Sequence, residues 1–258
     1  MCSSDLNPEV NGGSISGEGA ITVASGAALV PSGEVELGVT PSGGTVNVAN
    51  GAEVSCTGAA TIASTLAGSG EVSFATLPAS ALTLGDWTGT VELPVLAANQ
   101  AYQLNNYGKT GSTIRLNGLS AGWLAVATPI TVDANLELAG DWNLAAMSTR
   151  VYNFATVSGT GNMSFATTEN QPTSINIATL SGYSGAITNN TMATLTIGTL
   201  ALDSGADVSA GAKLLSTGGT GSFSVTAVTV GGEAQTLNLS YRSDGVYVRG
   251  PGTTFTVY

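Results

Sequence analysis

The chain has 258 residues, of which 43% are hydrophobic, only 9% are charged and 35 are glycine. This hydrophobic fraction excludes an intrinsically disordered chain, which needs low hydrophobicity and high net charge. The formal net charge is −11, and no basic residue precedes Lys109. Such a balance argues against nucleic acids and acidic membrane surfaces as partners. Histidine is absent, which excludes Ser-His-Asp and Cys-His catalysis and His-ligated zinc.

The first six residues, MCSSDL, resemble the translation of a sequencing adapter. We therefore expect residues 1–6 to be foreign to the natural protein. This predicts a fragment of a metagenomic gene whose own N-terminus, with any signal peptide, has been lost. No apolar run in the sequence reaches the roughly 18 residues that a transmembrane helix requires.

One short pattern, an apolar, a small polar and an apolar residue, recurs along the rest of the chain. Alternation in such short segments, separated by Gly, Ser, Asn or Pro, is typical of half-buried β-strands. The middle position holds Glu36, Glu92, Arg115 and Glu137, and we expect it to face solvent because a buried unpaired charge is costly. Cys56 occupies an apolar position and is expected to be a buried thiol. The predicted strands are centred on 21–23, 35–37, 46–48, 72–74, 82–84, 91–93, 114–116, 136–138, 175–177, 195–197, 228–230 and 246–248.

A second pattern, Gly-x-Gly followed by a strand, occurs four times. Two copies extend into a longer match, in which 65–76 parallels 156–167. Such repetition at irregular spacing predicts stacked coils whose loops vary in length. Glycine adopts positive φ without strain, so we expect these residues to form the turns between strands. The third glycine and the following helix of a nucleotide-binding loop are missing. The four pairs are Gly17 and Gly19, Gly68 and Gly70, Gly159 and Gly161, and Gly219 and Gly221.

The C-terminal region has a different pattern. Asp244 and Gly245 stand between two alternating runs, which indicates an antiparallel hairpin with Gly245 in its turn. We expect residues 7–236 to form the stacked coils and 237–258 to form a hairpin that caps the open strand edges.

The acidic residues give little support for a catalytic site. Most stand alone, and the nearest group is Asp133, Glu137 and Asp141. A pair of carboxylates for glycoside hydrolysis needs a defined separation of roughly 5–9.5 Å. A solvated surface is the preferred interpretation, so we expect no catalytic residues, no metal ligands and no cofactor.

Four aromatic residues are weak candidates for a glycan site. Trp87, Trp123, Trp142 and Tyr183 have rings that can stack on sugars. Trp87 and Tyr183 occupy equivalent positions in the two long repeat copies, which favours a structural contact instead.

The motif Gly-x-Gly-x-apolar-Ser-Phe, followed by an aromatic, Ser or Thr, Gly, any residue and Val or Ile, resembles the autotransporter-associated β-strand repeat of bacterial surface passenger domains. The resemblance is best over 68–93 and 159–187. The chain lacks the Asn that precedes the aromatic in that family. The resemblance implies a right-handed parallel β-helix displayed outside the cell as a stalk, shield or adhesin.

The sequence thus predicts an all-β fold, a right-handed parallel β-helix or solenoid, with tandem antiparallel β-sandwich modules as the alternative. The predicted function is that of a non-catalytic stalk or adhesin passenger, secreted or on a bacterial cell surface, as a monomer. Host or environmental glycans or proteins are its expected partners. The alternatives are a glycan-binding module that uses the exposed aromatics and, with less support, a solenoid polysaccharide lyase or hydrolase.

Overall fold

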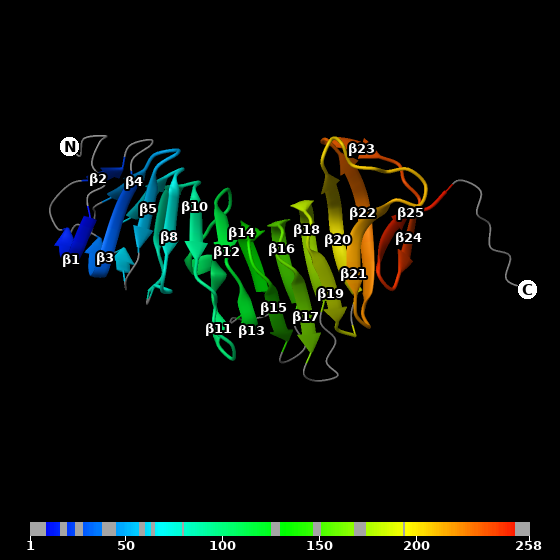
Figure 1. The fold of residues 1–258 in the computed structure, drawn as a ribbon, viewed down its shortest axis with the longest axis horizontal. Helices are drawn as coiled ribbons and strands as arrows, with labels where there is room; N and C mark the ends of the chain where they lie inside the picture. Colours follow the sequence, from blue (N-terminus) through cyan, green and yellow to red (C-terminus); the bar gives the residue numbers. More distant parts are fainter. Residues whose placement is uncertain are drawn as a thin grey trace, which may run out of the picture. The chain divides into compact units, whose positions relative to one another are not determined.

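The chain folds as a parallel β-solenoid (Figure 1). The computed structural model describes residues 9–15, 20–23, 28–37, 45–56, 60–62, 65–78, 80–124, 130–146, 151–167, 174–192 and 194–250. Apart from one short 3-10 helix, η1 (Leu104–Asn106), every regular element among these residues is a β-strand. The predicted solenoid is therefore confirmed, and tandem antiparallel sandwiches are excluded by the parallel pairing. No helix in the described part of the chain is long and apolar enough to cross a membrane.

The chain divides into two compact units. Unit 1 comprises 1–97, 102–118 and 132–137, and unit 2 comprises 98–101, 119–131 and 138–258.

Unit 1 contains two sheets of stacked strands. In the larger sheet, neighbouring strands come from successive coils and pair in parallel from β1 to β12. Its order is β1 (Glu9–Ile15), β3 (Ala28–Leu37), β5 (Glu53–Cys56), β8 (Glu71–Phe74), β10 (Thr90–Leu93), β12 (Thr113–Leu116) and β14 (Ile130–Leu138), with β6 (Ala60–Ile62) also on β3. The smaller sheet has the order β2 (Ala20–Val23), β4 (Thr45–Val48), β7 (Thr65–Gly68) and β9 (Thr83–Trp87).

Unit 2 repeats this arrangement and ends in antiparallel strands. One series is β16 (Val151–Gly159), β18 (Ser174–Tyr183), β20 (Thr194–Leu202), β22 (Ser222–Val230) and the antiparallel β23 (Glu233–Gln235). The other series is β13 (Leu119–Leu124), β15 (Trp142–Ala146), β17 (Met163–Thr167), β19 (Ala186–Asn190), β21 (Lys213–Gly218), β25 (Gly245–Val248) and β24 (Leu239–Arg242). A two-residue strand, β11 (Ala101–Tyr102), lies next to β13 in the strand order.

The core consists of apolar side chains stacked on apolar side chains of the next coil. In unit 1, Val91 is in register with Ile114, and both are fully buried. In unit 2, Ile175 is in register with Leu195, again with no exposed surface. Burying each such side chain contributes roughly 1.5–3 kcal/mol. The stacking of apolar side chains on apolar side chains therefore stabilises each coil against the coils next to it.

The middle residues of the triplets face outward where their side chains are described. Glu92, Arg115 and Glu137 are each partly exposed and flanked by buried residues, which confirms the predicted orientation. The side chain of Glu36 lies outside the described part. Cys56 is buried as predicted, and burial raises the pKa of its thiol to about 12.

The first glycine of each described Gly-x-Gly pair has a positive φ. The values are 101° at Gly68, 103° at Gly159 and 94° at Gly219, a region that favours glycine. Gly17 and Gly19 lie outside the described residues.

These turns also bring one coil onto the backbone of the previous one. The amides of the two residues after Gly159 both donate to the Leu138 carbonyl, each at 2.9 Å. The two amides after Gly68 share the Val48 carbonyl in the same way, at 3.0 and 2.9 Å. Each turn therefore fastens its coil to the preceding coil through one shared acceptor.

The C-terminal hairpin forms, but its turn differs from the prediction. β24 and β25 pair antiparallel, with Arg242 opposite Gly245, so Ser243 and Asp244 form the turn. Gly245 is the first residue of β25, and the expectation that it stands in the turn is wrong. A Cβ there would overlap the Lys213 side chain and lie against the Leu215 carbonyl. Close approach, rather than positive φ, explains this glycine.

We expect Gly161→Ala to lower the free energy of unfolding by about 1–3 kcal/mol, as overpacking commonly does. A Cβ on Gly161 would overlap the backbone carbonyl of Gly140 in the preceding coil, which no side-chain rotation can relieve. Denaturant titration followed by circular dichroism measures the effect. Gly205→Ala is the matched control, because a Cβ there meets no atom within 4 Å. Equal effects of the two substitutions would show that coil contact does not require glycine at position 161.

Candidate functional site

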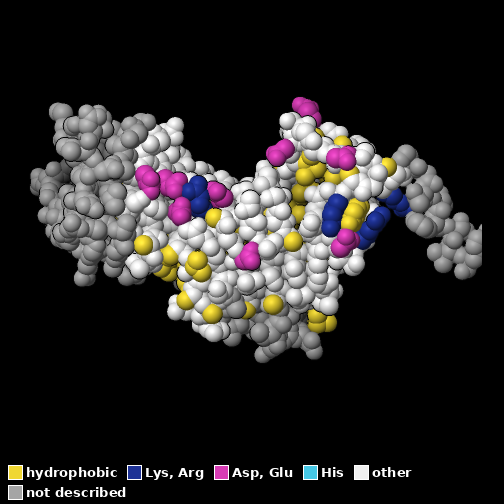
Figure 2. Space-filling view, viewed as in Figure 1, with side chains coloured by type: hydrophobic (Ala, Val, Ile, Leu, Met, Phe, Trp, Pro, Cys, Tyr) yellow, Lys and Arg dark blue, Asp and Glu magenta, His cyan; other side chains and the backbone are white. Residues whose placement is uncertain are grey.

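Four charged side chains meet on the outward face of unit 1. Arg115 on β12 lies 2.7 Å from Glu71, 3.0 Å from Glu92 and 3.1 Å from Glu137, measured between guanidinium nitrogens and carboxylate oxygens. We call these four residues the Arg115 cluster. Figure 2 shows acidic side chains grouped around basic atoms on this unit. Because β8, β10, β12 and β14 each contribute one residue, the cluster connects four strands.

Partial burial and hydrogen bonding act in opposite directions on these groups. Burial raises the pKa of Glu71 in spite of the neighbouring guanidinium. Burial also opposes ionisation of Glu92, but hydrogen bonds from Asn117 and Arg115 outweigh it and lower the pKa. For Arg115, burial is outweighed by the three carboxylates, which raise its pKa above its already high ordinary value. The cluster is therefore a network in which one guanidinium pairs with three carboxylates.

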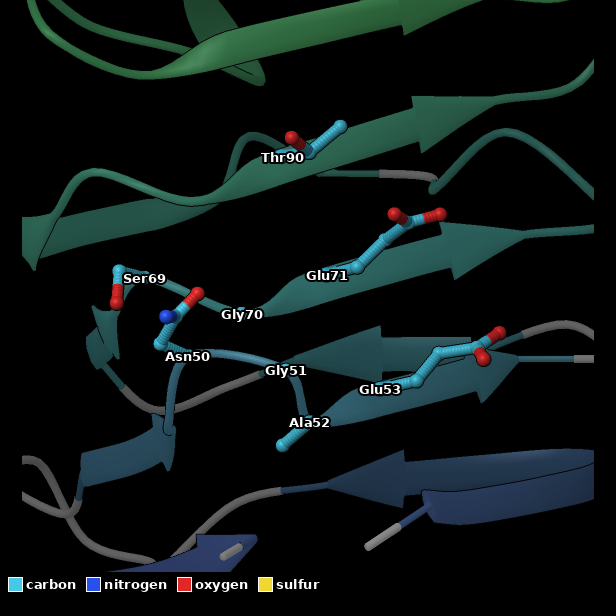
Figure 3. Close-up of a pocket in the computed structure, with 8 residues that line it drawn as sticks. All are labelled: Asn50, Gly51, Ala52, Glu53, Ser69, Gly70, Glu71 and Thr90. Atoms are coloured by element: carbon cyan, nitrogen blue, oxygen red, sulfur yellow. The ribbon is translucent and has the colours of Figure 1, made fainter. Parts of the chain in front are cut away.

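One member of this cluster, Glu71, lines an open pocket of about 320 Å³ (Figure 3). Glu53 and Glu71 line it from neighbouring strands and are in direct register. Ser55 donates a hydrogen bond to Glu53, while Glu71 is paired with Arg115. The pocket thus presents acceptor oxygens, without a basic side chain among the residues that line it. Its remaining lining residues are Asn50, Gly51, Ala52, Ser69, Gly70 and Thr90.

The predicted acidic group does not form one site. Asp133 and Glu137 both face outward from β14, but four residues separate them, which corresponds to about 13 Å along a strand. This exceeds the roughly 5–9.5 Å between the carboxylates of glycosidases. Asp141 belongs to unit 2, where it accepts hydrogen bonds from the backbone and side chain of Asn162, both at 3.0 Å. No group of three or more acidic, Cys or His side chains in the described part could hold a metal ion.

Two of the weak candidates for a glycan site, Trp87 and Trp142, are core residues, in agreement with the preferred interpretation of structural packing. Trp87 and Trp142 have no exposed surface. Trp142 packs edge-on against Phe154 and Phe165, at centroid distances of 5.4 and 6.4 Å. These indoles belong to the core because aromatic rings bury a large apolar area. The side chain of Trp123 lies outside the described residues.

Trp87 and Tyr183 instead pack against equivalent turns of their coils. A Cβ on Gly89 would overlap the indole of Trp87, two residues earlier. A Cβ on Gly185 would overlap the hydroxyl of Tyr183 in the same way. Tyr183 is half-buried, and its hydroxyl lies 2.9 Å from the Gly161 carbonyl. The recurring aromatic therefore covers a glycine turn, which is the structural alternative considered for these positions.

Two charged groupings were missed by the sequence reasoning. The Arg115 cluster had a signal, because Glu92 and Arg115 both occupy the middle of a triplet in successive coils. A second grouping lies on the C-terminal strands, where Lys213 and Arg242 lie over the ring of Tyr247. Its signal was that half of the six basic residues of the chain fall between 213 and 249.

Comparison of the chain with family models, with curated proteins and with solved structures gave no match.

We expect Arg115→Met to destabilise the protein by about 1–3 kcal/mol at pH 7. This lies between the values for exposed and buried ion pairs, because three carboxylates remain together without their cation. The loss should shrink as the pH falls through about 4, where glutamates become protonated. The sign follows from Glu92, whose lowered pKa contributes stability above its unfolded pKa and loses it on acidification.

Denaturant titrations at pH 7 and pH 4 test this expectation. Lys109→Met is the matched control, because it removes one positive charge from unit 1 whose ammonium group donates to a backbone carbonyl, that of Gly85, at 2.7 Å. A loss for Arg115→Met that is independent of pH would contradict the electrostatic explanation.

Proposed function

We propose that this chain is a non-catalytic structural segment of an extracellular stalk or adhesin passenger at a bacterial surface. The observation that carries the proposal is that charged side chains, which could act in catalysis, bind to neighbouring coils instead. Arg115 joins the carboxylates of three other coils, Lys109 reaches the Gly85 carbonyl, and Asp141 holds Asn162. These groups connect successive coils, whereas a catalytic site would gather them around a substrate.

The surface composition supports an extracellular setting. Only 9% of the residues are charged, against about 25% in ordinary soluble domains. The outward columns between coils hold neutral polar residues, such as Ser55 beside Ser73 and Asn153 beside Asn176, at 3.0 and 2.9 Å. The resemblance of the Gly-x-Gly repeats to passenger domains supports the same role.

The two alternatives have less support. A glycan-binding module would need exposed aromatic rings, but Trp87 and Trp142 are fully buried. A polysaccharide-degrading enzyme would need paired carboxylates, and those considered are too far apart or held by Arg115 and Asn162.

Surface display tests the proposed function. The full chain is placed between an outer-membrane anchor and an epitope on a non-adhesive bacterium, with the anchor and epitope alone as control. We expect antibody labelling of intact cells, resistance of the displayed chain to added proteinase, and no release of reducing sugars from a polysaccharide panel. Degradation at the surface would overturn the stalk role, and sugar release by the purified chain would overturn the non-catalytic assignment.

A further inference from the structure

The C-terminal hairpin presents a polar outward face. Within β21, β25 and β24, Tyr247 is directly opposite both Lys213 and Ser240. Residues opposite one another in an antiparallel pair share a face of the sheet. The other face of β25 is apolar, with Val246 fully buried and Val248 nearly so.

Two cations on this outward face are held by the ring of Tyr247. The guanidinium carbon of Arg242 lies 4.4 Å from the ring centroid, and the ammonium nitrogen of Lys213 lies 5.6 Å from it. Asp244 fixes the group from the turn, since it accepts a hydrogen bond from the Tyr247 hydroxyl at 2.6 Å and pairs with Lys213 at 3.3 Å. Lys213 lies across Gly245, where a Cβ would overlap it. The cations are therefore positioned before any ligand arrives.

The charge of this face is opposite to that of the chain. Lys213 and Arg242 lie here beside the carboxylate of Asp244, in a protein of net charge −11. We call Lys213, Arg242 and Tyr247 the hairpin face. Figure 2 shows basic side chains gathered over the C-terminal strands. Within the described part of the chain Arg242 forms no ion pair, whereas Arg115 has three carboxylate partners.

We propose that the hairpin face binds a carboxylated polysaccharide, of which polyuronates are the simplest class. An arginine stacked on an aromatic ring keeps the edge of its guanidinium open for a carboxylate, which it binds through two parallel hydrogen bonds. The hydroxyl of Ser240 lies in the same row of the sheet and suits the hydroxyls of a sugar. The interaction is ionic, so it weakens as salt is added.

Charge density and surface chemistry favour this ligand over other anions. Duplex nucleic acid carries one charge per about 1.7 Å, and a chain of net charge −11 repels so dense a polyanion. A stable protein partner needs an apolar centre in its interface. Tyr241 is the large exposed hydrophobic residue on these strands, and its hydroxyl is engaged by the backbone of Val225 on the other side of the hairpin. A polysaccharide with spaced carboxylates needs neither feature.

Binding of the purified full chain to polygalacturonate tests the proposal, with isothermal titration calorimetry at low and at physiological salt. The matched ligand is fully methyl-esterified polygalacturonate, which has the same backbone without free carboxylates. We expect binding to the acid form alone, and a loss of about tenfold on Arg242→Gln, which corresponds to about 1.4 kcal/mol. Lys109→Gln removes a positive charge from unit 1 and should leave the affinity unchanged.

Circular dichroism checks that each variant is folded. Lys213→Gln provides a second test on the same face. Absence of binding, equal binding of the methyl ester, or wild-type affinity in both variants would overturn the proposal. Tighter binding of duplex DNA or of an acidic protein through the same residues would overturn the ligand class.

The inference deepens the adhesin role and rests on it for its extracellular setting. The two experiments distinguish failure of the stalk role from failure of polysaccharide binding. Surface display needs no polysaccharide, and the binding measurement uses no cells.

Discussion

The close approach of one coil to the next is the constraint on which this structure depends. Parallel strands stack ~4.8 Å apart, and at the turns the backbone of one coil meets the backbone of the previous one. Gly161 lies against Gly140, and Gly185 lies against Gly161. A side chain at these corners would force neighbouring coils apart and disrupt the register of the adjoining strands. The glycine turns and the aromatic rings that cover them are two parts of one solution.

Stacking in register also determines where charge can be placed. Equivalent positions of successive coils become direct neighbours, so Glu53 lies beside Glu71, and like charges opposite one another are destabilising. Arg115 offsets this in the adjoining coils by pairing with three carboxylates. The hairpin face has the reverse balance, with cations in excess of carboxylates. The two surfaces therefore differ in kind. In the first, the only cation of the cluster is shared among three carboxylates, whereas the second has a cation left over for an external anion.

The sequence was sufficient to predict the strands, the solenoid and the outward position of Glu92, Arg115 and Glu137, because a period of two is a local property. It was not sufficient to predict which charges meet. The number of residues between the strands of successive coils varies with the lengths of the loops. The partners of Arg115 therefore could not be identified from their separation in the sequence. Trp87 and Trp142 were weak candidates for stacking on sugars, because the sequence alone does not state which aromatic rings are buried. Gly245 was assigned to a turn from its dipeptide, whereas contact with Lys213 across the sheet accounts for it.

The order of charges across β10, β12 and β14 bears on how such a protein can change in length during evolution. Solenoids grow and shrink by whole coils, and the coils here repeat the same apolar, polar, apolar triplet. The coil that carries Arg115 is an exception, because its deletion would bring Glu92 beside Glu137. Gain or loss of coils in this region is therefore restricted to events that keep a cation between these carboxylates.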